Sequence, residues 1–264
     1  MTINFLDGNA NKALLILYFK KDFKSIKGYL TIALAIGAVF LNYIFVNIIL
    51  KSSESSIPNL DQSLFWYGIL VSYRLFGILI AIILAFDLIS NDFSKNTSMA
   101  LYSILPRKTY LLRNYILLLI HLAFLELISF ITFDIVIFLF FQSFLNFTTL
   151  IMGFLYMYIY LSFVLTLTFC ISTLTKRTFL SIMIPFVYFF IIDQILPGTD
   201  LHFLSYSYYV DNISLGIQNL LFGVPFLINS VEMIWSLIIF FSLPVILFLI
   251  SIFGFQYQDI KTSR

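Results

Sequence analysis

Six apolar segments dominate this chain, and each is long enough to cross a bilayer as a helix. Charged residues make up 11% of the sequence, against roughly 25% in a soluble domain. In hydrocarbon each backbone N–H and C=O must be paired internally, which favours helices, and the alternation typical of barrel strands is absent. We therefore predict one all-α, polytopic membrane domain over residues 1–264, with six transmembrane helices at about 28–50, 64–90, 111–141, 149–174, 179–196 and 231–255.

The distribution of basic residues predicts the orientation of these spans. Thirteen of the 15 Lys and Arg residues fall on one side, and the other side has Lys51, while the loops 142–148 and 197–230 have none. Lysine and arginine are retained in the cytoplasm during insertion. We expect a multi-pass protein of the plasma membrane with both termini cytoplasmic, and we expect the N-terminal residues not to act as a cleavable signal peptide.

Two segments outside the predicted spans have helical periodicity. Residues 12–27 place apolar side chains on one face and lysines on the other, which predicts an N-terminal interfacial helix. The alternative is a cytoplasmic extension of the first transmembrane helix. Ile213, Ile217 and Leu220 keep helical spacing within the loop 197–230, which predicts short outer helices between spans five and six.

Three charged residues fall deep within the predicted spans, away from the span ends. Arg74 is expected about 15 Å below the outer surface, Asp134 about 11 Å and Glu126 about 22 Å. Because a charge near the bilayer centre costs at least about 2.5 kcal/mol, Arg74 should be paired, first with Asp134 and second with Glu126. The three form either part of a translocation path or a structural ion pair between two helices.

Five further residues are expected to have structural roles. A buried, unreactive side chain is predicted for Cys170. His121 and His202 have no acidic or thiol neighbours at ligand spacing, so packing or hydrogen bonding is expected and a metal site is not. Asp87 and Asp193 lie near span ends, where we expect them to be solvated.

The sequence lacks the motifs of common enzymes. It contains no GxxxxGK[ST] phosphate loop, no HExxH metal motif and no GxSxG nucleophile elbow. We therefore predict no catalytic residues, no metal and no cofactor on this chain.

The loop between the second and third predicted spans is compact and charged. Residues 90–94 can cap and start a short helix, and Asn96 or Thr97 can cap another. Pro106 would end that helix, and the basic residues after it would hold the loop at the cytoplasmic surface. Such a short, half-apolar helix is suited to docking into a groove of a soluble protein.

This loop resembles that of ABC-2 type transporter permeases, in which an acidic residue, a Thr, an apolar stretch, Pro and basic residues precede the third span. The matching residues are Asp92, Thr97, Leu101, Leu105, Pro106 and Arg113, and Asn96 stands where the family usually has Gly. The resemblance implies a cytoplasmic coupling loop at about 90–110, with the contact residues Asp92, Phe93, Lys95, Asn96, Thr97, Leu101, Pro106, Arg107 and Lys108.

The resemblance also implies the function and the partners. The chain would be the permease subunit of an ABC exporter, moving a substrate by alternating access, and ATP and Mg²⁺ would bind a separate ATPase subunit. A second permease copy or a related permease would complete a homo- or heterodimer in membrane lipid, and no nucleic acid is involved. The alternatives are an ion- or proton-coupled secondary transporter and a non-transporting membrane anchor or assembly factor.

Overall fold

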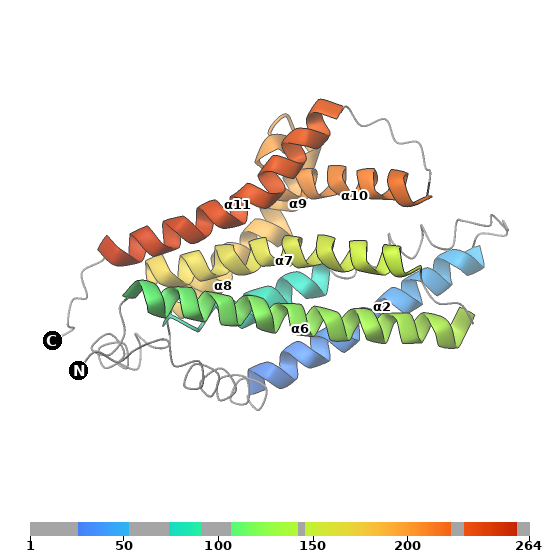
Figure 1. The fold of residues 1–264 in the computed structure, drawn as a ribbon, viewed down its shortest axis with the longest axis horizontal. Helices are drawn as coiled ribbons and strands as arrows, with labels where there is room; N and C mark the ends of the chain where they lie inside the picture. The colour runs from blue at the N-terminus through green and yellow to red at the C-terminus, as the bar shows by residue number, and fades with distance from the viewer. Residues whose placement is uncertain (1–25, 53–73, 91–106, 142–145, 223–229, 258–264) are drawn as a thin grey trace.

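The computed structural model describes residues 26–52, 74–90, 107–141, 146–222 and 230–257, and these residues form helices joined by short turns (Figure 1). No strand occurs among them. The all-α prediction is therefore confirmed for the described part of the chain. The predicted interfacial helix at 12–27 lies almost wholly outside it.

Four of the described helical segments are long and apolar enough to cross a membrane, and two more are apolar but shorter. The long ones lie in α6 (Arg107–Phe141), in α7 (Phe147–Thr175), in Thr178–Gly198 and in α11 (Ser230–Tyr257). The shorter ones are Lys27–Leu41, within α2 (Ile26–Ser52), and Arg74–Ala85. These helices are compatible with a membrane protein, and the count of six spans stays a prediction.

The longest described helix, α6, contains neither Gly nor Pro over its 35 residues. At about 1.5 Å per residue it is about 52 Å long, which exceeds the roughly 30 Å hydrocarbon core of a bilayer. Arg107, Lys108 and Arg113 make its first two turns polar.

Helix α7 lies at the centre of the bundle and packs against α6, α8 (Thr178–Val187), α10 (Tyr206–Phe222) and α11 (Figure 1). More than half of its residues are buried, among them Tyr156, Tyr160 and Phe169. Its start is capped by Asn146, whose side chain accepts a hydrogen bond from the Thr148 amide at 3.3 Å. Its end is capped by Lys176 in the left-handed conformation.

The fifth predicted span is helical over Thr178–Gly198 but not uniformly α-helical. Helix α8 contains Pro185 and continues into a π-helical turn, η1 (Tyr188–Ile192), before the short α9 (Asp193–Ile195) and the 3-10 turn η2 (Leu196–Gly198). Pro185 has no backbone N–H to donate, and the π-helical geometry begins three residues after it.

The second predicted span was expected to continue to residue 90, but the described α-helix ends at Ala85 and turns follow. Side chains of other helices take up the carbonyl groups at this end. Lys27 Nζ donates to the Leu84 carbonyl at 2.7 Å, and Ser172 Oγ donates to the Phe86 carbonyl at 3.0 Å. Because these groups are satisfied from outside, the helix does not need to continue.

Asp193 is fully buried, which corrects the expectation that it is solvated. Its carboxylate accepts hydrogen bonds from Ser205 Oγ at 2.7 Å and from the Ser207 amide at 3.1 Å, and also from the Ser207 hydroxyl. These serines lie at the start of α10, so the carboxylate also faces the positive end of that helix. The position of Asp193 near the end of a predicted span did not indicate that the start of α10 packs over its side chain.

We predict that Asp193→Asn lowers the free energy of unfolding by about 2 kcal/mol, because a buried amide cannot accept all three hydrogen bonds. Thermal unfolding in detergent measures the change. Asp200→Asn, which alters an exposed side chain in the following turn, is the matched control and should leave the stability unchanged. Equal effects of the two substitutions would contradict the anchoring role of Asp193.

Candidate functional site

The predicted coupling loop is only partly described. The following predicted contact residues lie outside the described residues: Asp92, Phe93, Lys95, Asn96, Thr97, Leu101 and Pro106. Arg107 and Lys108 are described and open α6. The described residues on both sides of the loop therefore indicate where it begins and ends.

Both flanks of the loop lie at the same end of the bundle. On the N-terminal flank, Ser90 Oγ lies 3.0 Å from Thr178 Oγ1, at the start of α8. On the C-terminal flank, Arg107 Nη1 donates to the Gln256 carbonyl near the end of α11, at 3.3 Å. The start of α6 and the ends of α7 and α11 accordingly lie together on the left of Figure 1.

Basic side chains gather at this end of the bundle. We call Arg107, Lys108, Lys176 and Arg177 the basic end. Lys176 is partly buried, and both that burial and the charge of Arg107 lower the pKa of its ammonium group. Arg107 also donates to the Gln256 carbonyl of α11, which packs along α7, so the start of α6 and the end of α7 are linked through the end of α11.

A salt bridge lies beside the basic end. Lys27 Nζ and Asp87 Oδ1 are 2.5 Å apart, and both side chains are largely buried. The expectation that Asp87 is simply solvated is therefore wrong, because Lys27 at the start of α2 packs against the end of the helix Arg74–Ala85. The pair joins these two helices.

Arg74 pairs with Asp211 of α10, which corrects the expectation of Asp134 or Glu126 as its partner. Arg74 Nη1 lies 3.3 Å from Asp211 Oδ2, and Nη2 donates to Oδ1. Asp211 was missed because the depths of charged residues were compared only among the predicted spans, and α10 was taken as part of an outer loop. In the structure α10 packs against α7 and reaches the start of the helix that carries Arg74.

A sequence signal for Asp211 was present. Polar residues recur at helical spacing along α10, and their side chains are buried or half-buried: Ser207, Asp211, Ser214 and Gln218. A polar stripe that points into a protein needs polar partners there. This stripe, read together with Arg74, could have identified the pair.

Aromatic side chains of α7 surround the Arg74–Asp211 pair. The Tyr156 hydroxyl donates to the Val210 carbonyl at 2.8 Å and also interacts with Arg74. Tyr160 is fully buried and stacks on Tyr206 with ring centroids 6.0 Å apart. Within the described residues, the Tyr160 hydroxyl has no hydrogen-bond partner.

Glu126 and Asp134 do not join this cluster. Glu126 is 3% exposed, and neither carboxyl oxygen has a hydrogen-bond partner among the described residues. Asp134 lies further along α6 and is half-buried. The three predicted intramembrane residues therefore do not form one group.

The remaining candidates have structural surroundings. Cys170 and His121 are buried, and His202 lies in the 3-10 turn η3 (His202–Leu204), where its ring packs against Tyr208 at 4.7 Å. Among the described residues, no group of three or more His, Cys, Asp or Glu side chains is placed to hold a metal ion.

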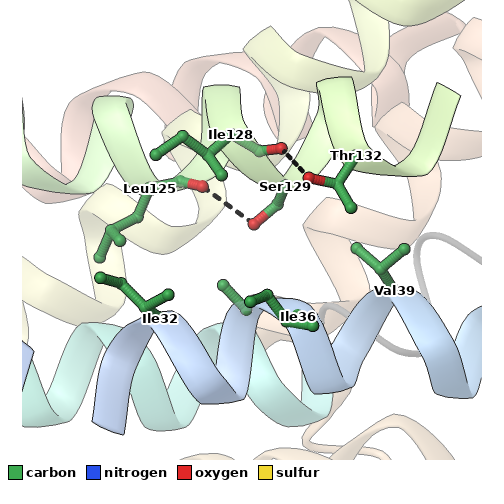
Figure 2. Close-up of a pocket in the computed structure, with 8 residues that line it drawn as sticks. Ile32, Ile36, Val39, Leu125, Ile128, Ser129 and Thr132 are labelled. Carbon is green, nitrogen blue, oxygen red and sulfur yellow. Dashed lines mark hydrogen bonds between the residues drawn. The ribbon is translucent and has the colours of Figure 1, made fainter. Parts of the chain in front are cut away.

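A cavity lies between α2 and α6 and is mainly apolar (Figure 2). Its lining includes Ile32, Ile36 and Val39 of α2, facing Ser129 and Thr132 of α6. Both hydroxyls donate to carbonyls of their own helix, at 2.9 and 2.8 Å. The cavity wall therefore provides apolar contacts, and its two hydroxyl groups already donate hydrogen bonds within α6.

Comparison of this chain with protein-family models, with curated proteins and with solved structures finds no match.

We predict that the Arg74–Asp211 pair shows coupling in a double-mutant cycle. Arg74→Leu and Asp211→Leu each leave one charge without its partner, so the double variant should be more stable than the two single effects predict, by about 1 kcal/mol for a partly exposed pair. Thermal unfolding in detergent measures the cycle. The matched cycle of Arg74→Leu with Asp134→Leu should be additive, and coupling to Asp134 alone would contradict the observed pairing.

Proposed function

We propose that this chain is the membrane-spanning subunit of an ABC transporter of the ABC-2 type, and that it works as an exporter. The loop at 90–110 supplies the resemblance, and the all-helical structure with its apolar helices is compatible with it. ATP hydrolysis is assigned to a separate subunit, to which ATP and Mg²⁺ bind.

The observation that carries the proposal is the position of the loop's two flanks. Ser90 and Arg107 both lie at the basic end, beside the α7–α8 turn. Basic residues favour the cytoplasmic side of a membrane. A loop attached there is in position to meet a soluble ATPase, and six spans with both termini on that side complete the proposed topology.

The contacts of the helix Arg74–Ala85, which precedes the loop, provide a path for the movement that would drive transport. Its end is joined to α7 and α8 through Ser172 with Phe86 and through Ser90 with Thr178. Its start is joined to α10 by the Arg74–Asp211 pair. Closure of the ATPases would move the loop, and the helix would carry that displacement from the basic end toward α10.

The ion-coupled alternative has less support from the geometry. It was based on Arg74, Glu126 and Asp134 acting together, whereas Arg74 pairs with Asp211. A non-transporting anchor would need no coupling loop. Both alternatives predict no dependence on an ATPase partner.

We predict that the purified protein retains a phosphate-loop ATPase in mild detergent and loses it when residues 92–104 are replaced by a Gly/Ser linker of the same length. Affinity purification followed by mass spectrometry measures retention. Replacing residues 142–145, on the predicted opposite side, is the control and should leave the ATPase bound. An ATPase that stays bound after the 92–104 replacement, or is absent from the wild-type preparation, would contradict the proposal.

A further inference from the structure

The turn between α7 and α8 has an unusual backbone. Lys176 caps α7 with a φ of 55°, and among the described residues it is the only one other than glycine with a positive φ. The left-handed region is costly for a residue with a Cβ atom, and glycine is the usual residue there. Lys176 holds this conformation at the point where α7 ends and α8 begins.

Positive charges are concentrated around this turn. Arg177 follows directly as the N-cap of α8 and makes no side-chain capping bond. Arg107 at the start of α6 donates to the Gln256 carbonyl near the end of α11, which packs along α7. Partial burial, with the charge of Arg107 as the second cause, lowers the pKa of the Lys176 ammonium group. Like charges at short range repel, and an anion placed between them would be attracted by each.

An apolar strip begins directly after this turn. Phe179, Met183 and Phe186 recur at helical spacing on α8, and all three side chains are exposed, Phe179 at 69%. Phe186 stacks on Phe190, with ring centroids 4.7 Å apart, and so extends the strip into the π-helical turn. The strip leads away from the charges along the length of the helix.

We propose that the α7–α8 turn and the apolar strip of α8 form a binding site for an anionic phospholipid. The phosphate would lie at Lys176 and Arg177 within reach of Arg107, and an acyl chain would lie along Phe179, Met183 and Phe186. The ligand class follows from charge complementarity at one end of the site and apolar contact along the rest.

Other occupants match the surface less completely. An acidic segment of a soluble protein would satisfy the basic residues but leave the apolar strip of α8 in contact with neutral lipid. A second copy of this chain could cover the strip, but it would bring no anion to the turn unless one of its acidic residues met it. An anionic phospholipid accounts for both parts of the surface, and this assignment does not depend on the ATPase partner.

The test measures lipid retention on the full chain. The protein is reconstituted in nanodiscs that contain equal amounts of phosphatidylglycerol and phosphatidylcholine. It is then released from the nanodiscs, and native mass spectrometry identifies the lipids that stay bound to it. Wild type should retain phosphatidylglycerol preferentially, and Arg177→Gln should reduce that preference about fivefold, the effect of one basic residue near an anionic surface. Lys176→Arg keeps the positive charge and should therefore keep the preference for phosphatidylglycerol.

Lys51→Gln is the matched control, since it removes one positive charge on the predicted opposite side. Equal retention of both lipids by wild type, or the same loss in Lys51→Gln as in Arg177→Gln, would overturn the proposal. Phe179→Cys in a Cys170→Ser background adds an independent reading. Disulfide-linked dimers through this cysteine would assign the strip to a second copy and also overturn the proposal.

Discussion

The cost of placing a charge in hydrocarbon is the constraint on which this structure depends. Basic residues collect at one end of the bundle, where the ends of α6, α7 and α11 meet (Figure 1). Charged side chains away from that end are mostly given partners, as in the Arg74–Asp211 pair and in the serine hydroxyls around Asp193. Among these, Glu126 is the exception, because neither carboxyl oxygen has a hydrogen-bond partner within the described residues.

These polar contacts also determine how the helices are joined. The helix Arg74–Ala85 is fixed at its start by Asp211 and near its end by Lys27 and Ser172, which lie on three different helices. Apolar packing alone tolerates sliding of one helix along another, whereas each hydrogen bond fixes a position. A displacement that enters at residue 90 would therefore be passed on to specific neighbours, which is what the proposed coupling requires.

The sequence predicted where the described helices begin and end better than it predicted which side chains contact one another. The third, fourth and sixth predicted spans begin and end close to α6, α7 and α11, because apolar length alone determines where such helices lie. The partner of Arg74 was wrong because depth along a helix gives no information about which neighbour packs against it. The burial of Asp193 depends on its contacts with the start of α10, for which the local sequence gives no signal.

The account depends most directly on which side of the membrane the basic end faces. Single cysteines placed at Arg177 and at Thr199, in a Cys170→Ser background, separate the two ends of the fifth predicted span. In intact cells a membrane-impermeant maleimide should label Thr199→Cys and should label Arg177→Cys only after the membrane is permeabilised. Labelling of Arg177→Cys from outside intact cells would contradict the account.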